Sequence, residues 1–204
     1  MIGDIDMQKK EYEKYLNLAL STGADFAELY YEESKNRIFR LNDSKLDSID
    51  TSDEKGLGIR IVSAGESYYT STNILTEKNI STIIKRLLKN IPKNTSKKVK
   101  LKSKKNYKNQ VLIPHDKYPT NKKKELLYLI DKTARNYSEL VVQVSAGIVE
   151  TDKSFTIANS NGKYVSSSST LTRIITTVYT EKKDIKEHEF VDYGKGMGYE
   201  ILDE

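Results

Sequence analysis

Residues 56–73 read GLGIRIVSAGESYYTSTN, and their pattern of apolar and polar residues indicates the fold class. Apolar and polar residues alternate on both sides of Ala64-Gly65-Glu66, which is a sequence typical of a tight turn. Such alternation indicates strands with one buried face and one wetted face, as antiparallel sheets have. The stretch therefore predicts two neighbouring strands of an antiparallel meander.

Three segments earlier in the chain alternate in the same way, with turn signals at Asn42-Asp43 and over residues 53–56. A helix is expected before them, over about residues 6–21, with Gly23 capping its end. A second helix is expected over residues 77–90, with Thr76 as its N-cap. Its apolar stripe consists of Ile80, Ile83, Ile84, Leu87 and Leu88. Residues 1–90 thus form a predicted N-terminal α+β domain.

The same plan recurs over residues 111–204, the predicted central α+β domain. A helix over residues 119–137 precedes strand-like segments, and NSNG predicts a hairpin in which Asn161-Gly162 accept positive φ. The helix has one apolar side, made of Leu126, Leu127, Ile130 and Ala134. The expected fold class is α+β and sheet-rich, with two helix-plus-antiparallel-meander modules. This plan resembles a duplication, although no residue-level repeat supports one.

The net charge of +5 comes from one segment. Between Ile91 and Lys124 there are twelve lysines and one acid, Asp116, so the rest of the chain is acidic. Residues 91–110 are predicted to be a lysine-rich linker or an extended edge, because like charges resist compaction. Tyr107 and Tyr118 could stack on bases, but the segment has no Arg and no recognisable nucleic-acid-binding motif. Nucleic acid is therefore not an expected partner.

Composition excludes several further classes. The chain has 204 residues and no Cys, so disulfides and thiolate metal sites are excluded. Its first twenty residues carry charges throughout, unlike a signal peptide or a membrane anchor. A cytoplasmic protein without membrane contact is expected.

The sequence HEFVD, residues 188–192, raises the possibility of a zinc site. Zinc peptidases place two histidines four residues apart on a helix, whereas this segment has Asp192 at the second position and a strand-like pattern. On a strand, His188 and Asp192 would stand roughly 13 Å apart, too far to share a metal. The other histidine, His115, is distant in sequence. A mixed-charge surface strand is expected instead.

Two glycine clusters and a serine run have similarly simple interpretations. Gly56-x-Gly58 is expected to open a strand, and Gly194, Gly196 and Gly198 follow one with no helix expected after them. A dinucleotide-binding loop needs its glycines between the end of a strand and the start of a helix. Neither glycine cluster has this context, so these glycines are expected in turns or bulges. Ser166 to Ser169 have no adjacent His and predict a polar strand rather than a nucleophile.

The order and wording of the segments resemble the TldD/PmbA family, whose members are described as modulators of DNA gyrase and as zinc metallopeptidases. The resemblance covers essentially the whole chain. Its most specific pieces are Gly23-Ala24-Asp25, Gly56-x-Gly58-Ile59-Arg60, Ala158-Asn159-Ser160-x-Gly162 and Gly198-Tyr199-Glu200. The last of these resembles the TldD side of the family.

The resemblance implies an N-terminal and a central domain of a peptidase whose zinc motif, His-Glu-x-x-x-His, lies in a later C-terminal domain. No position here matches that motif, so we assign no catalytic residue and no metal ligand, and the substrate-binding residues are unknown. Zinc is implied for the full-length family protein and no cofactor is expected in this chain. The implied partners are a peptide or unfolded-protein substrate and family subunits in a homo- or hetero-oligomer.

Three hypotheses follow. The chain is the non-catalytic N-terminal and central part of a TldD-like metallopeptidase, providing scaffold, substrate admission and subunit contacts. Alternatively, it is a stand-alone shortened family member that binds and regulates a full-length subunit. A reading frame that continues past codon 204 into a zinc motif would favour the first. The third hypothesis is a polyanion binder using the lysine segment, which predicts DNA affinity that collapses with salt.

Overall fold

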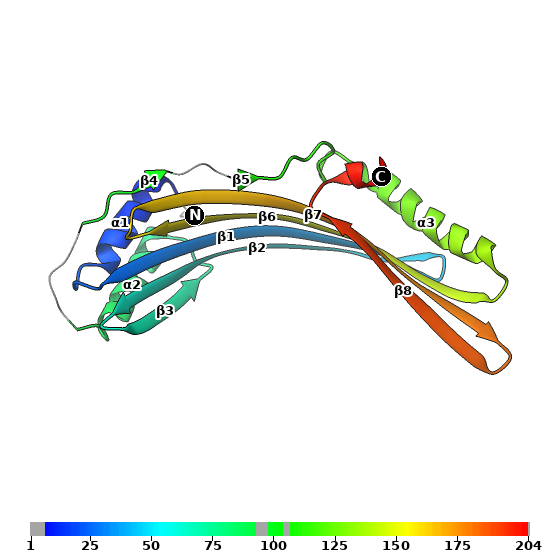
Figure 1. The fold of residues 1–204 in the computed structure, drawn as a ribbon, viewed down its shortest axis with the longest axis horizontal. Helices are drawn as coiled ribbons and strands as arrows, with labels where there is room; N and C mark the ends of the chain where they lie inside the picture. Colours follow the sequence, from blue (N-terminus) through cyan, green and yellow to red (C-terminus); the bar gives the residue numbers. More distant parts are fainter. Residues whose placement is uncertain (1–6, 93–97, 104–106, 204) are drawn as a thin grey trace. The chain divides into compact units, whose positions relative to one another are not determined.

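The computed structural model describes residues 7–92, 98–103 and 107–203, and it confirms a sheet-rich α+β fold (Figure 1). In chain order the elements are α1 (Lys9–Ala19), β1 (Phe26–Asn42), β2 (Lys45–Ser63), β3 (Glu66–Thr72), α2 (Glu77–Leu88), β4 (Lys102–Ser103), β5 (Tyr107–Lys108), α3 (Thr120–Tyr137), β6 (Val141–Asn159), β7 (Lys163–Lys182), β8 (Ile185–Lys195) and the 3₁₀ helix η1 (Tyr199–Asp203).

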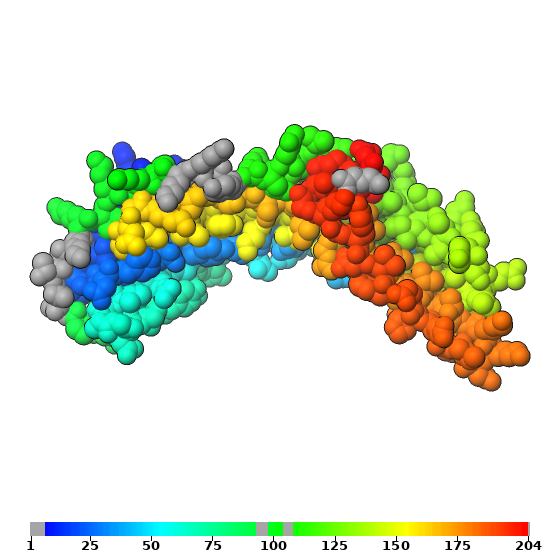
Figure 2. Space-filling model, viewed as in Figure 1, coloured from blue at the N-terminus to red at the C-terminus, as the bar shows by residue number. Residues whose placement is uncertain are grey.

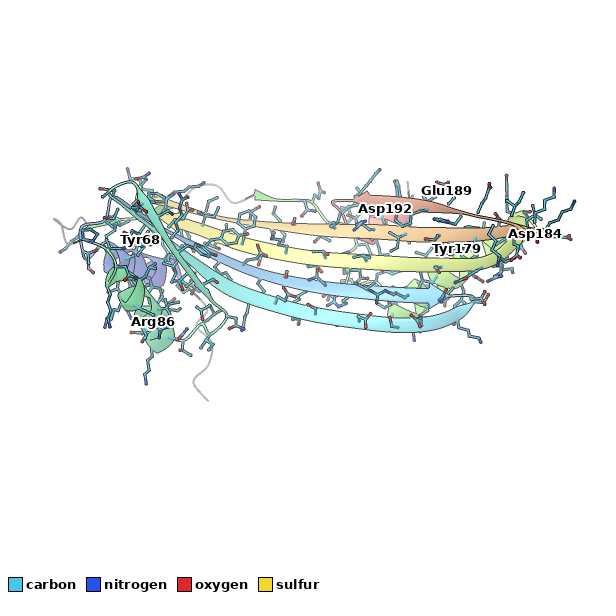
Figure 3. The ribbon with its side chains drawn as sticks, turned by 90° about the horizontal axis from the view of Figure 1, so that it is seen from below. Tyr68, Arg86, Tyr179, Asp184, Glu189 and Asp192 are labelled. Carbon is cyan, nitrogen blue, oxygen red and sulfur yellow. The ribbon has the colours of Figure 1, made fainter. Side chains whose placement is uncertain are left out.

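The strands follow the order β3-β2-β1-β6-β7-β4, and β5 and β8 also pair with β7. Figure 3 shows β8 beside β7, with Glu189 and Asp192 on β8 and Tyr179 on β7. The residues form two compact units. Unit 1 comprises residues 1–33, 54–107 and 154–168, and unit 2 comprises residues 34–53, 108–153 and 169–204. The division into domains 1–90 and 111–204 with a linker 91–110 remains a prediction. Each compact unit combines three separate segments of the chain, so the units do not correspond to these continuous ranges.

The core of unit 1 lies among α1, α2 and the strand segments of that unit. Tyr12, Leu16 and Ala19 of α1 are buried on one side of the helix, as the three- and four-residue spacing predicts. Gly23 follows with φ of 84°, a left-handed conformation that glycine adopts without strain. α2 begins after Thr76, whose hydroxyl accepts a hydrogen bond from the Asn79 amide at 3.3 Å. Both predicted N-terminal helices are thus confirmed.

The lysine segment contributes to this core. Within residues 98–103, Leu101 is buried and Val99 is half-buried against the unit 1 cluster, while Lys98, Lys100 and Lys102 are exposed. The backbone runs along α1, because Glu13 accepts a hydrogen bond from the Leu101 amide at 3.0 Å. Lys102 and Ser103 then pair with β7 in parallel. The described residues therefore form an extended edge, whereas residues 93–97 and 104–106 lie outside the described part.

Unit 2 has its own cluster. Phe39 and Leu41 alternate with more exposed neighbours on β1. They belong to one cluster with Ala146 and Ile148 of β6 and Leu127 of α3. Figure 1 shows α3 running alongside the strands of this unit. The predicted helix over residues 119–137 is confirmed, with Leu127 fully buried and Leu126 and Ile130 packed at the edge of the cluster.

The strands are longer than the sequence predicted. β2 runs without interruption from Lys45 to Ser63, so the turn expected over residues 53–56 is wrong and Gly56 lies inside a strand instead of opening one. The reason is that residues 50–55 are exposed, so no buried face marks them as a strand. The turn predicted at Asn42-Asp43 forms one residue later, at Asp43-Ser44, with φ of 49° and 63°. In the hairpin between β6 and β7, positive φ occurs at Gly162 but not at Asn161, which corrects that prediction.

No helix in the described ranges combines the length and the apolar character needed to cross a membrane.

Candidate functional site

Residues 188–192 form part of β8, as predicted, and their side chains are exposed. His188 lies opposite Tyr179 of β7 and stacks on it, with ring centroids 5.6 Å apart. Asp192 forms an ion pair with Arg173. These residues do not fit a zinc site, because His188 and Asp192 are four residues apart on an extended strand. Across residues 7–92, 98–103 and 107–203, no three His, Asp or Glu side chains are grouped to hold a metal ion.

The other predicted candidates are structural. Gly58 lies inside β2, where an added Cβ would meet the Tyr69 hydroxyl at 2.9 Å. Ser166 is in β7, and its hydroxyl is 2.8 Å from that of Thr156. Gly196 and Gly198 follow β8 and lead directly into η1, so the expectation of no helix after them is wrong.

Several charged and polar side chains gather around the buried Glu150 in unit 2 and form an ionic cluster. The Glu150 side chain is 0% exposed, and its Oε1 lies 2.5 Å from Nζ of Lys123, which is 4% exposed. The same oxygen accepts a 2.6 Å hydrogen bond from the Tyr199 hydroxyl. The second oxygen, Oε2, is 3.5 Å from the Arg37 guanidinium. Strands β1 and β6, helix α3 and η1 each contribute a residue to this ionic cluster.

His115 extends the ionic cluster in a second direction. Lys123 Nζ donates a 2.9 Å hydrogen bond to the backbone oxygen of His115. The His115 ring is itself buried between two partners, since Nδ1 lies 2.9 Å from Asp152 and Nε2 lies 2.9 Å from the Thr172 hydroxyl. Thr172 donates in turn to the backbone oxygen of Met197 at 2.7 Å. These links join the segment around residue 115 to α3, β6 and β7, and Thr172 joins β7 to the residues before η1.

Backbone contacts hold η1 in place beside the ionic cluster. The Glu200 carboxylate accepts hydrogen bonds from the amides of Leu112, Ile113 and Gly198, at 3.1, 2.8 and 3.1 Å. Gly198 approaches Ile113 so closely that an added Cβ would lie 2.0 Å from the Ile113 carbonyl oxygen. The geometry therefore requires glycine at position 198 and positions Tyr199 next to Glu150.

Aromatic packing closes the ionic cluster. The Tyr118 ring stacks on the Tyr199 ring at 3.9 Å with an interplanar angle of 6°, and Lys123 Nζ lies 5.1 Å from the centre of the Tyr199 ring. Tyr118 is thus used inside unit 2 rather than as a platform for bases. The side chain of Tyr107 lies outside the described residues.

Burial and hydrogen bonding shift the pKa of three residues in and beside the ionic cluster, namely Tyr199, Asp152 and Glu200. Burial and the hydrogen bond to Glu150 raise the pKa of Tyr199 well above its usual value, so the hydroxyl keeps its proton. Burial alone would raise the pKa of Asp152, but hydrogen bonds from His115 and Thr170 outweigh it and lower that pKa. Burial also tends to raise the pKa of Glu200. Hydrogen bonds that the Glu200 carboxylate accepts from backbone amides outweigh the effect of burial, so the pKa of Glu200 is lowered. The polar side chains of the ionic cluster thus interact with one another inside unit 2.

A second anchor joins α3 to the turn between β1 and β2. Asp131 is buried, and its two oxygens accept hydrogen bonds from the Ser44 hydroxyl at 2.7 Å and from Arg135 Nε at 3.2 Å. Arg135 also pairs with Asp43 of the same turn. Both ends of the buried face of α3 are thus fixed by a charged side chain.

Unit 2 also contains a pocket of about 280 Å³. Its lining combines apolar atoms of Ile175 and Phe190 with polar groups of Arg40 and Asn42. The polar groups already have partners, because Arg40 pairs with Asp50 and the Asn42 side-chain oxygen accepts hydrogen bonds from Gln143 and Ser145. The pocket has room for a small apolar group.

Sequence reasoning missed His115, Lys123, Glu150 and Asp152. One signal was present in the sequence. Lys123 and Asp131 each lie four residues from Leu127, so both share a helix face with this fully buried residue. A charged residue on a buried face implies a buried partner. The partner, Glu150, comes from a strand 27 positions later, and no local pattern identifies it.

The pH dependence of stability tests the geometry around Asp152. Because its pKa is lower in the folded state, Asp152 contributes stability at neutral pH, and the contribution is lost as pH falls through the folded pKa. Asp152→Asn is expected to lower the urea midpoint at pH 7, and this difference from the wild type should shrink by about pH 3. The exposed neighbour Asp116 provides the control, since Asp116→Asn should leave the midpoint unchanged at both pH values. A constant difference at both pH values for Asp152→Asn would contradict the assignment.

Two family models match the chain. The model of PmbA/TldA metallopeptidase domain 1 matches residues 27–91, and that of the PmbA/TldA metallopeptidase central domain matches residues 113–204. No curated protein matches the sequence.

The fold is similar to those of several solved structures. One, described as a candidate modulator of DNA gyrase from Bacteroides thetaiotaomicron, has a TM-score of 0.74 at 18% identity, covering 97% of this chain and 46% of the other. A second candidate modulator, from Thermotoga maritima, has a TM-score of 0.74 at 16% identity, covering 93% and 44%. TldE from Thermococcus kodakarensis has a TM-score of 0.67 at 15% identity, covering 90% and 42%. At these identities the likeness concerns the fold alone, and this chain spans less than half the length of each neighbour.

Proposed function

The chain belongs to the PmbA/TldA metallopeptidase family, and we propose on this premise that it is the non-catalytic N-terminal and central part of a TldD-like zinc metallopeptidase. In this role it provides the scaffold, helps to admit peptide substrate and makes subunit contacts. Hydrolysis is then the task of residues outside this chain, as the family resemblance implies.

One observation carries the proposal: the two family models match in the order domain 1, central domain, over residues 27–91 and 113–204. The ionic cluster supports it. Lys123 and Glu150, two of the most deeply buried acid–base side chains of unit 2, are paired with each other, and the buried His115 ring contacts Asp152 and Thr172. These pairings favour holding the fold over reacting with a substrate.

Substrate admission is proposed to use extended backbone. A peptide can add to a sheet edge through main-chain hydrogen bonds, a mode that accepts many sequences. An unfolded protein or peptide is therefore the proposed substrate class of the complete enzyme. The proposed location is cytoplasmic, in keeping with the charges spread over the first twenty residues.

Metal analysis of the purified 204-residue chain tests the proposal. After incubation with excess zinc chloride and desalting, the chain is expected to retain only a small fraction of one zinc per chain, measured by inductively coupled plasma mass spectrometry. His188→Ala and His115→Ala serve as matched variants and should give the same low value. One tightly held zinc per chain that is lost in His188→Ala would overturn the proposal.

A further inference from the structure

We propose that His115 carries a proton on both ring nitrogens in the folded chain, and that loss of one proton breaks its contact with β6. The contacts of the ring with Asp152 and Thr172, and of Thr172 with the backbone oxygen of Met197, are called the His115 link. They join the segment around residue 115 to β6, β7 and the residues before η1. Figure 2 shows the segment before α3 beside the residues leading into η1. This pH-sensitive contact goes beyond the proposed function.

The proton count begins at the Thr172 hydroxyl, which has one hydrogen to donate. Its oxygen lies 2.7 Å from the backbone oxygen of Met197, and a carbonyl oxygen only accepts, so the hydroxyl hydrogen is used there. The same hydroxyl oxygen lies 2.9 Å from Nε2 of His115. Because the hydroxyl has no second hydrogen, Nε2 is the donor in this contact. His115 therefore carries a proton on Nε2.

The other ring nitrogen faces a carboxylate. Nδ1 of His115 lies 2.9 Å from one oxygen of Asp152, and the second oxygen accepts a 2.8 Å hydrogen bond from the Thr170 hydroxyl. Burial alone would raise the pKa of Asp152, but hydrogen bonds from His115 and Thr170 outweigh it and lower that pKa, so Asp152 is ionised at neutral pH. An ionised carboxylate has no hydrogen to donate, so Nδ1 supplies the one between them. With both nitrogens protonated, the ring is a cation.

The charged groups around the ring suit a cation at this position. Asp152 of β6 is the direct counterion of His115. Lys123 of α3 donates to the backbone oxygen of His115 at 2.9 Å, and its own charge is balanced by Glu150, 2.5 Å away. Arg37 of β1 acts electrostatically on Asp152 and favours the ionised form of its carboxyl. The cation is therefore matched by a carboxylate, and the nearby lysine has a carboxylate of its own.

Other groups that contact the ring or its partners are neutral. Tyr199 of η1 meets the ring edge-on, with centroids 5.9 Å apart and an interplanar angle of 83°. Burial and the hydrogen bond to Glu150 raise the pKa of Tyr199, so its hydroxyl adds no charge. β7 contributes the hydroxyls of Thr170 and Thr172. The contacts therefore give His115 the surroundings of an ion pair rather than of an isolated buried charge.

Loss of the Nδ1 proton changes this arrangement. The nitrogen lone pair then faces the Asp152 carboxylate across 2.9 Å, which places two acceptors together with no hydrogen between them. The His115 side chain is 0% exposed, whereas Asp152 is 37% exposed and can turn toward solvent. The contact with β6 is therefore lost, while Nε2 still donates to Thr172. Because Asp152 must also be ionised, the His115 link exists only over a middle range of pH.

Nuclear magnetic resonance of the 204-residue chain, labelled with ¹⁵N in histidine, tests the proton count. The chain has only two histidines, His115 and the exposed His188. At about pH 6, both ring nitrogens of His115 are expected to show a directly bonded hydrogen, and both signals should vanish in His115→Gln. His188→Gln should keep them, and it provides the assignment if His115→Gln does not fold. A single protonated nitrogen on His115 at this pH overturns the inference.

Urea unfolding between about pH 6 and about pH 9 tests the consequence, because histidine ordinarily changes charge between about pH 5 and 8. A proton that the folded chain binds and the unfolded chain releases stabilises the fold at low pH, and this stabilisation is lost as pH rises. The urea midpoint of the wild type is therefore expected to fall over this range. His188→Gln, the matched control, should show the same fall.

Asp152→Asn separates the ion pair from an ordinary hydrogen bond. An asparagine amide can donate to an unprotonated Nδ1, so the fall in the urea midpoint between about pH 6 and about pH 9 should be absent in this variant. A wild-type midpoint that stays constant over the range, or a fall that persists in Asp152→Asn, overturns the inference. None of these measurements uses zinc or a peptide, so the inference and the proposed function can fail separately.

Discussion

Replacing Glu150 by Ala is expected to lower the free energy of unfolding by about 3–5 kcal/mol, because it leaves a buried lysine without its counterion. Lys123 Nζ lies 2.5 Å from Glu150 and is only 4% exposed, so water cannot replace the carboxylate. The Tyr199 hydroxyl loses its acceptor in the same variant. Urea unfolding followed by far-UV circular dichroism measures the change.

Two further variants sharpen this test. Glu125→Ala removes a carboxylate from the same helix as Lys123, but one that is 59% exposed, and should cost less than about 0.5 kcal/mol. The double variant Lys123→Met, Glu150→Gln removes both charges and keeps an acceptor for Tyr199, so it should recover most of the lost stability. Equal effects of Glu150→Ala and Glu125→Ala would show that the ionic cluster does not stabilise unit 2.

Replacing Ile84 by Ala is expected to cost about 2–5 kcal/mol, because it opens a cavity in the core of unit 1. Ile84 is fully buried in α2 within a cluster that includes Leu16 and Ile61. Ile83, its neighbour on the same helix, packs only at the margin of that cluster. The same urea experiment should therefore give a clearly smaller loss for Ile83→Ala, and similar losses for the two variants would contradict the assigned orientation of α2.

The helix and hairpin patterns could be predicted because each depends on neighbours in sequence. In α2, the stripe of apolar residues at three- and four-residue spacing identified the buried face, and Ile80, Ile84 and Leu88 are its most buried members. The hairpin around Ala64-Gly65 could be predicted for the same reason, and its register closes at Ser63↔Glu66.

The ionic cluster could not be predicted because its members come from distant parts of the chain. Lys123 alone looks like a solvated lysine in a basic run, and only the fold brings Glu150 and Tyr199 to it. The full length of β2 was missed for a related reason: a strand exposed on both faces has no alternation to detect.

Several residues that carry the family resemblance turn out to fix the backbone. Asp25 accepts a hydrogen bond from the Ala64 amide at 2.8 Å, next to the turn between β2 and β3. Ser160 accepts one from the Ala27 amide at 3.0 Å, and Asn159 accepts from the Lys163 amide at 3.3 Å across the following turn. With Tyr199 and Glu200, these contacts give the quoted motifs a structural explanation in this chain.

We propose that the chain supports peptide hydrolysis without performing it. The most direct measurement is mass spectrometry of an unstructured peptide mixture incubated with the purified 204-residue chain and zinc chloride. The expected result is the same peptide pattern as in a chain-free control. New cleavage products that disappear with His188→Ala, or with the folded double variant Lys123→Met, Glu150→Gln, would contradict the claim.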